Sequence, residues 1–383
     1  MIAAPSLPQP RTARVWAETG WSFLEPLVCG VVPILFPSIV LIAASQHNYI
    51  AVDFHAHFWP AAHQVLHGIS PFPGPHDQIT LGSFIYPAFA AVVLVPFALL
   101  PRAVADPLFT VLLAAALFGT LRVLRIRDWR CYGIVLLWAP VFHALHTANF
   151  TILVALGLAL LWRFRDRALV SGLTLGVMIA LKVFLWPLIV WLIAAKRYRA
   201  AAWSVACAAA ISLAAWGVAG FSELAYYPRI VLEFDRISAP ATYTLVGFGM
   251  KAGLGQTAAQ AIAWVVGAGA LAGAIVLARR QGITAVSFAA AIFAVLLLSP
   301  IVWLHYFTFL IVPLALLRPR FGPLWLVPIV AWPLPVGPAG PSWYTLPLFV
   351  GAGALLILSA RPLPRMTRLR ALVASPATGA GSG

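Results

Sequence analysis

The stretch SGLTLGVMIALKVFLWPLIVWLIAAKRYRAA (171–201) has two apolar runs on either side of a single lysine, Lys182, and ends in the basic cluster KRYR (196–199). The whole chain has this character, because 62% of its 383 residues are hydrophobic and only 9% are charged. About a quarter of the residues in an average soluble domain are charged, so this chain has too few charged residues to cover a surface that faces water. Spanning backbone must satisfy its own hydrogen bonds, and we therefore predict an all-α membrane protein.

Apolar runs recur along the chain and predict about twelve transmembrane helices in one polytopic domain over residues 27–360. A cytoplasmic N-terminal segment (1–26) precedes this domain, and a basic, disordered tail (361–383) follows it in this prediction. The expected helical segments are 27–45, 84–100, 107–123, 131–146, 149–163, 168–181, 183–195, 200–220, 258–278, 284–298, 300–317, 323–338 and 344–360.

The net charge of +15 comes from short basic clusters that lie between apolar runs. Such clusters mark cytoplasmic loops, so we predict a plasma-membrane protein with both termini in the cytoplasm and no nucleic-acid partner. Two crossings between 84 and 123 would leave the cluster 122–130 outside, so either one of these segments is re-entrant or the positive-inside rule fails there, and we predict a re-entrant segment. The clusters are at 122–130, 163–167, 196–199, 279–280, 318–320 and 361–370.

Neither a disulfide framework nor a metal centre is predicted. The chain has three cysteines, Cys29, Cys131 and Cys207, and none forms a CxxC pair. His63 and His67 have the i, i+4 spacing of zinc ligands on a helix but lack a clear third ligand. We accordingly expect no metal and no cofactor.

The connection 46–82 contains no lysine or arginine, so it is predicted to lie on the extracytoplasmic side. Residues 57–67 have apolar side chains at helical spacing, which predicts an amphipathic helix at the membrane surface. Asp53 comes just before this helix and has two interpretations. It is either a helix cap or solvated loop residue, or a carboxylate at the lipid–water boundary that accepts a proton from a substrate hydroxyl.

Lys182 and His305 are isolated ionisable residues within apolar sequence, at the same predicted depth. Such residues are costly in a membrane and are functional candidates. The simpler alternatives are that Lys182 extends to the interface and that His305 packs between helices with a hydrogen bond.

Four motifs in order resemble glycosyltransferase family 87 of the GT-C superfamily. These are Asp53 followed by an aromatic helical patch that ends in Gly-x-x-Pro-aromatic (68–72), a Tyr86-Pro87 helix that ends in Leu-Pro, a Gly-x-x-x-Gly helix that leads to Lys182, and Ser-Pro-x-x-Trp-x-His (299–305). The resemblance covers about residues 25 to 320. It implies a GT-C-like fold and a transferase that uses a polyprenol-phosphate sugar, as bacterial mannosyltransferases of membrane glycolipids do.

The resemblance also implies roles for these residues. Asp53 would be the catalytic base, and Tyr86, Lys182 and His305 would bind the donor and its phosphate. This chain departs from the family pattern at three places: Ala88 replaces a proline, ANFT (148–151) replaces Gly-Gln-x-Asn, and the proline after the lysine is delayed to Pro187.

Further polar and aromatic residues are candidates for the substrate groove, with solvated loop or interfacial positions as the alternatives. The candidates are His55, His57, His146, Asn149, Trp303, Arg229 and Arg236. His143, Trp59 and Trp186 are further possible contacts of the sugar or the prenyl chain.

The predicted function is the transfer of a hexose, with mannose favoured, from a polyprenol-phosphate donor to a lipid or glycan acceptor on the extracytoplasmic side. One carboxylate base is enough for a single, inverting displacement. The alternatives are a transporter or flippase of a lipid-linked saccharide, and an inactive transferase-like assembly partner. A transporter typically has related halves, and we detect no internal repeat. The bilayer is an expected partner, and the sequence indicates no oligomeric state.

Overall fold

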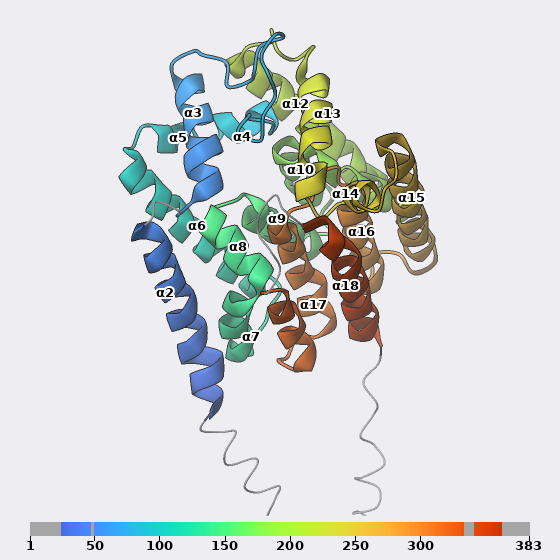
Figure 1. The fold of residues 1–383 in the computed structure, drawn as a ribbon. Coiled ribbons are helices and arrows are strands. Elements are labelled where there is room, and N and C mark those ends of the chain that lie inside the picture. Colours follow the sequence, from blue (N-terminus) through green and yellow to red (C-terminus); the bar gives the residue numbers. More distant parts are fainter. Residues whose placement is uncertain (1–23, 47–49, 333–340, 362–383) are drawn as a thin grey trace, which may run out of the picture.

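The computed structural model describes residues 24–46, 50–332 and 341–361, and every regular element in these ranges is a helix (Figure 1). This confirms the all-α prediction. Most of the predicted N-terminal segment (1–26) and tail (361–383), and part of the predicted helix 323–338, lie outside the described residues.

The α-helices are α2 (Val32–Gln46), α3 (Trp59–Leu66), α4 (Ala88–Val92), α5 (Val95–Ala98), α6 (Arg102–Val123), α7 (Trp129–Ile134), α8 (Ala139–Thr147), α9 (Thr151–Arg163), α10 (Ala168–Leu181), α11 (Pro187–Ala194), α12 (Tyr198–Ala219), α13 (Tyr227–Ser238), α14 (Leu245–Lys251), α15 (Gln256–Gln281), α16 (Ala285–Leu298), α17 (Ile311–Leu317) and α18 (Thr345–Ala360). Short π- or 3-10 helices accompany them: η1 (Leu27–Val31), η2 (Phe54–Phe58), η3 (Val135–Leu137), η4 (Val183–Leu185), η5 (Ala239–Ala241), η6 (Leu304–Leu310), η7 (Pro323–Ala331) and η8 (Pro341–Tyr344).

Four helical segments of the described chain are long and apolar enough to cross a membrane: Leu24–Ala43, Arg102–Val123, Tyr198–Ala219 and Gln256–Gln281. The pair α8 and α9, bent by 119°, would make a fifth if it forms one span. Shorter apolar helices account for much of the remaining bundle, and the count of about twelve spans stays a prediction.

The segment predicted at 84–100 is not one helix. It is divided into α4 and α5, each of them far shorter than the ~20 residues that a span requires. Pro96 lies in the first turn of α5 and Pro101 precedes α6, and proline cannot continue a helix that comes before it. Between residues 84 and 123, α6 alone has the length of a crossing. A broken segment at 84–100 suits the predicted re-entrant element.

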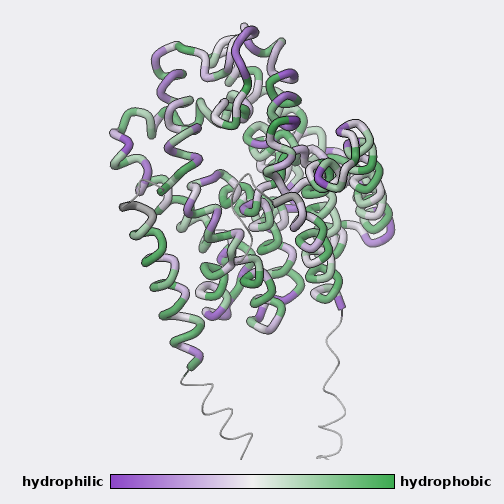
Figure 2. Tube along the Cα trace, viewed as in Figure 1, coloured by the Kyte–Doolittle hydropathy of each residue, from purple (hydrophilic) through white to green (hydrophobic). Residues whose placement is uncertain are grey.

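The bundle has two distinct ends. The start of α2 and the end of α18 lie at one end, whereas α3, α4 and α13 lie toward the other (Figure 1). Hydrophobic residues dominate the helices between these ends, and hydrophilic residues gather largely in the connections (Figure 2). The common end of α2 and α18 suits two termini on one side, and which side faces the cytoplasm stays a prediction.

The Gly-x-x-x-Gly motif in α10 lets this helix pack closely against α12. A Cβ atom on Gly172 would lie 2.7 Å from the Ala200 carbonyl oxygen, and one on Gly176 would lie 2.9 Å from the Ser204 carbonyl oxygen. Small residues at such contacts allow the backbones of membrane helices to approach each other. This packing fixes the end of α10, where Lys182 follows.

Candidate active site

Asp53 and Tyr86 are joined by the buried amide of Asn149. The Asn149 Nδ2 group donates to Asp53 Oδ2 at 2.6 Å and to the Tyr86 hydroxyl oxygen at 3.1 Å. The Asn149 carbonyl oxygen accepts from the backbone N–H of Thr151 at 3.1 Å and from its hydroxyl at 2.8 Å. A backbone N–H can only donate, so Thr151 fixes the orientation of the amide and directs both Nδ2 hydrogens toward Asp53 and Tyr86.

The turn between α8 and α9 positions Asn149. Ala148 ends α8 in the left-handed conformation, with φ of 49°, and α9 begins again at Thr151. A left-handed residue other than glycine is strained, and such residues cluster at functional sites. The segment ANFT (148–151), which departs from the family pattern, therefore still supplies a buried amide to Asp53.

Asp53 occupies the position before η2, but its side chain makes no capping hydrogen bond. The structure therefore gives no support to the helix-cap interpretation. Asp53 belongs to the connection before α3 and lies outside the candidate spans. Burial raises the pKa of its carboxyl group, and the Asn149 hydrogen bond and the nearby His57, Lys182 and His146 oppose this rise to a smaller extent.

Lys182 lies between α10 and η4, and its backbone is extended there, with φ of −146°. Its side chain is only 2% exposed, and its Nζ atom has no hydrogen-bond partner within the described residues. Nζ lies 4.2 Å from the ring centre of Tyr306, 5.3 Å from that of Tyr86 and 5.7 Å from that of Phe184. Aromatic faces attract this ammonium group but leave its three N–H donors unused.

The rings of His305 and Tyr306 are adjacent, with their centres 5.0 Å apart. It also stacks on His143, and the two Nδ1 atoms are 3.2 Å apart, so that one donates and the other accepts. The side chain is 2% exposed, and Nε2 has no hydrogen-bond partner in the described part of the chain. His305 thus packs between helices and also borders the aromatic group that surrounds Lys182.

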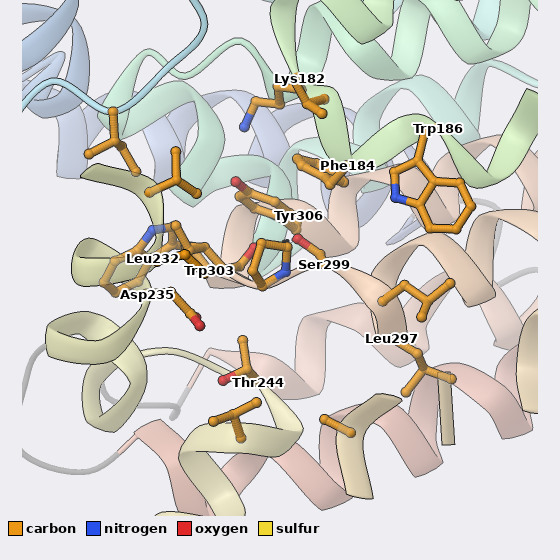
Figure 3. Close-up of a pocket in the computed structure, with 18 of the residues that line it drawn as sticks. Lys182, Phe184, Trp186, Leu232, Asp235, Thr244, Leu297, Ser299, Trp303 and Tyr306 are labelled. Carbon is orange, nitrogen blue, oxygen red and sulfur yellow. Dashed lines mark hydrogen bonds between the residues drawn. The ribbon is translucent and has the colours of Figure 1, made fainter. Parts of the chain in front are cut away.

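A cavity of about 520 Å³ lies beside this cluster (Figure 3). Its wall includes Tyr86, Lys182, Trp303 and Tyr306, together with many apolar side chains and a few other polar ones. Several apolar wall residues are also well exposed on the protein surface: Val183 (53%), Trp186 (38%), Leu232 (69%) and Trp264 (52%). The cavity therefore connects a buried ammonium group with an apolar outer surface.

Of the three predicted site residues Asp53, Lys182 and His305, only Lys182 lines the cavity. Asp53 and His305 are absent from the cavity wall, and each is adjacent to a wall residue, through Asn149 to Tyr86 and directly to Tyr306. The three residues nevertheless belong to one cluster, because the Lys182 Nζ atom contacts the rings of both Tyr86 and Tyr306. Tyr86 shares the Asn149 amide with Asp53, and Tyr306 is next to the ring of His305.

The remaining predicted groove residues are divided between this cluster and other parts of the structure. His57 and His146 are close to Asp53, and Trp303 lines the cavity. His55 lies elsewhere, since its Nδ1 is 2.8 Å from Asp106 Oδ2 and its Nε2 is 3.4 Å from an Arg102 nitrogen.

Two predicted arginines and a histidine pair lie outside the cavity wall. Arg229 donates to the Pro75 carbonyl oxygen at 3.2 Å, and Arg236 is exposed. The rings of His63 and His67 are adjacent and tilted, with their centres 4.3 Å apart. The described residues contain no group of three potential metal ligands.

Sequence reasoning gave no site role to Tyr306 or Asp235, and it did not identify α13. Tyr306 lies directly after the predicted His305, inside a continuous apolar run. The helix α13 buries Ile230, Phe234 and Ser238, which have i, i+4 and i+8 spacing. This spacing is a readable signal of an amphipathic helix.

Two comparisons with known proteins found matches to this chain. A family model described as Glycosyltransferase family 87 matches residues 84–300, a range that includes Tyr86, Asn149 and Lys182 but not Asp53 or His305. One relative, from Mycolicibacterium smegmatis, is 28% identical over 276 residues, which are 65% of this chain and 60% of the relative. Another, from Mycobacterium tuberculosis, is 28% identical over 286 residues, which are 67% of this chain and 59% of the relative.

Both relatives are named polyprenol-phosphate-mannose-dependent alpha-(1-2)-phosphatidylinositol pentamannoside mannosyltransferases. The chain matches about 60% of the length of these relatives. No solved structure matches the chain.

Proposed function

Because this chain belongs to glycosyltransferase family 87, we propose that it transfers a hexose from a polyprenol-phosphate donor to a lipid or glycan acceptor on the extracytoplasmic side of the membrane. Mannose is the proposed hexose, and the names of the two relatives support this choice. Asp53 is the proposed general base, and Lys182 is the proposed partner of the donor phosphate.

The reaction is a single displacement at the anomeric carbon. Asp53 takes the proton from the acceptor hydroxyl as its oxygen bonds to that carbon, and the bond from the carbon to the phosphate oxygen breaks. The electron pair stays with the departing polyprenol phosphate. Attack from the side opposite the phosphate inverts the anomeric configuration, so one carboxylate is enough.

Asn149 keeps the base in position for this step. Its amide donates to Asp53 at 2.6 Å and is itself held by Thr151. A base that is fixed by such contacts loses less freedom when the acceptor binds, which favours the reactive geometry. Burial raises the pKa of Asp53, and a higher pKa makes the carboxylate a stronger proton acceptor.

Lys182 supplies positive charge where negative charge develops on the leaving phosphate. Its Nζ atom is buried, has no hydrogen-bond partner within the described chain and lines the cavity. Three free N–H donors in a dry site interact strongly with an anionic oxygen. The exposed apolar wall residues on the other side of the cavity offer a route for the prenyl chain toward lipid.

One observation carries the proposal. A buried ammonium group without a hydrogen-bond partner, Lys182, lies in the same cluster as the hydrogen-bonded carboxylate of Asp53, beside a cavity with an apolar outer wall. A lipid-linked sugar phosphate has the matching parts, namely an apolar chain, an anion and a reactive carbon next to it.

The test uses the full-length protein in lipid nanodiscs with radiolabelled polyprenol-phosphate mannose and a bacterial polar lipid extract as the acceptor. We expect a labelled glycolipid with inverted anomeric configuration, and at least about 100-fold slower formation of this product by the Asp53→Asn variant. Polyprenol-phosphate glucose in a parallel reaction tests the choice of mannose. The absence of product from every donor, or full product from Asp53→Asn, would contradict the proposal.

A further inference from the structure

A second buried carboxylate, Asp235, faces the cavity from α13 (Figure 3). The residue is 6% exposed, and its Oδ1 atom has no hydrogen-bond partner within the described residues. Lys182 and Asp235 extend from different helices, the end of α10 and α13, and line the same space. The cavity therefore has a cationic group and an anionic group in separate parts of its wall.

The position of Asp235 follows from how α13 is anchored. Near the start of the helix the Tyr227 hydroxyl donates to the Ile85 carbonyl oxygen at 3.0 Å, and Arg229 donates to the Pro75 carbonyl oxygen at 3.2 Å. Ile230 and Phe234 pack their side chains inward on the same face. These contacts hold Asp235 at the cavity, although burial there does not stabilise a carboxylate that has no partner.

Burial of the Asp235 carboxylate disfavours its charged form, and no neighbouring group of the described residues compensates for this. Burial alone raises the pKa of Asp235 to about 6, and no neighbouring positive charge contributes. A buried charge without a partner is unfavourable and is usually paired or replaced. In a ligand-binding cavity the ligand can provide the missing hydrogen bonds.

The chemistry of Asp235 restricts the part of a ligand that it can bind. An ionised carboxylate only accepts hydrogen bonds, so it repels phosphate and prefers hydroxyl or N–H groups. The nearby hydroxyls of the wall already donate elsewhere. Thr244 Oγ1 is 3.1 Å from Thr242 Oγ1, which itself donates to the Ala239 carbonyl oxygen, and Ser299 Oγ donates to the Ile301 carbonyl oxygen at 2.7 Å. Trp303 contributes an aromatic surface to the same wall, and a sugar ring can pack on such a surface.

We propose that Asp235 binds hydroxyl groups of the donor's hexose while Lys182 binds its phosphate, and that Asp235 thereby determines which sugar is accepted. This inference rests on the proposed function. It assigns Asp235 a role in sugar recognition that is separate from proton removal by Asp53.

The test compares the binding of two ligands, polyprenol phosphate and polyprenol-phosphate mannose, by the quenching of tryptophan fluorescence in nanodiscs. The wild-type protein should bind the mannose-bearing form about tenfold to hundredfold more tightly, the range expected for hydrogen bonds to a charged group. Asp235→Ala should remove this preference and leave the affinity for polyprenol phosphate unchanged. Lys182→Met should weaken the binding of both ligands.

Glu233→Gln is the matched control, because Glu233 is a carboxylate on the same helix that does not line the cavity. It should keep the preference for the mannose-bearing ligand. A structural role for Asp235 would lower the thermal stability of Asp235→Asn without ligand, whereas an unpartnered carboxylate predicts a higher stability. Equal loss of both ligands in Asp235→Ala, an unchanged preference, or a destabilised Asp235→Asn would overturn the inference.

Binding and transfer fail independently in this design. If Asp235 controls the preference but no glycolipid forms in the transfer assay, the sugar-recognition inference stands and the enzymatic proposal fails. If glycolipid forms and the preference does not depend on Asp235, the enzymatic proposal stands and this inference fails.

Discussion

Asp53 and Asp235 are acidic side chains outside the candidate spans, and their surroundings in the structure differ. Asp53 accepts a short hydrogen bond from Asn149 and lies near Lys182, His57 and His146. Asp235 has an unpartnered oxygen and no positive neighbour that alters its pKa. Burial raises the pKa of both carboxyl groups.

The protein itself positions the Asp53 carboxylate, whereas the Asp235 carboxylate can gain hydrogen bonds only from a ligand. A carboxylate held by an amide is ready to act on a substrate proton, because its geometry does not depend on the substrate. A carboxylate without a partner gains its hydrogen bonds only when a ligand arrives, so it contributes to affinity and selectivity. Substitutions at Asp53, Lys182, Asn149 and Asp235 test the two sides of this comparison.

The largest effect is expected for Asp53→Asn, which retains the shape of the side chain but removes the proton acceptor. The rate of transfer should fall by about 100- to 10,000-fold, the range of general base catalysis. The affinity for polyprenol-phosphate mannose should change little, since the base acts on the acceptor. Single-turnover kinetics with labelled donor measure the rate, and a variant within about twofold of wild type would show that Asp53 is not the base.

Lys182→Met is expected to have the next largest effect, because it replaces the buried ammonium group with an apolar side chain of similar length. The rate should fall by about 100- to 1,000-fold, as for loss of a donor to a developing oxyanion, and donor affinity should also fall. Lys251→Met is the control, since Lys251 is an exposed lysine in the last turn of α14. Equal effects of both substitutions would remove the special role of Lys182.

Composition and periodicity were enough to predict an all-helical membrane protein and its helices on either side of Lys182, because apolar runs and a lone charge are local signals. The same signals predicted a single helix at 84–100, where prolines break the chain into α4 and α5. Loss of hydrogen bonds at proline outweighs apolar character there.

The partners within the site were harder to predict. The hydrogen bond between Asn149 and Asp53 joins residues 96 positions apart, and no sequence period encodes it. No sequence motif singles out Asp235, and its position in the cavity wall distinguishes it from Glu233 on the same helix. Candidate ionisable residues can thus be listed from the sequence, whereas which of them contact one another depends on how distant helices pack.

Asn149→Leu tests whether the amide tunes the base. Asp53 must be ionised to accept a proton, so the transfer rate should rise with pH through its raised pKa. The Asn149 hydrogen bond lowers this pKa, and its loss should move the rising limb of the rate–pH profile to higher pH. The rate should fall most on the acidic side of the profile and recover as the pH rises. Thr151→Val, which removes one of the two bonds to the Asn149 carbonyl oxygen, should give a smaller shift in the same direction. A uniform fall at every pH would contradict the tuning role.

The smallest effect concerns the stability of the ligand-free protein and the carboxylate that lacks a partner. The pKa of Asp235 is about 6 in the folded protein, whereas the ordinary pKa of an aspartate is 3.8, so between these values the folded state holds more protons than the unfolded state. Stability should therefore decrease as pH rises from about 4 to about 6, by at most about 3 kcal/mol, and stay low above it. Asp235→Asn cannot ionise and should lack this part of the decrease, so that at pH 7 it melts a few degrees above wild type. Thermal unfolding in detergent at pH 4.5 and pH 7 measures the difference, with Glu233→Gln as the control. A variant that melts below wild type at pH 7 would mean that Asp235 already has a partner in the free protein, and the contrast with Asp53 would disappear.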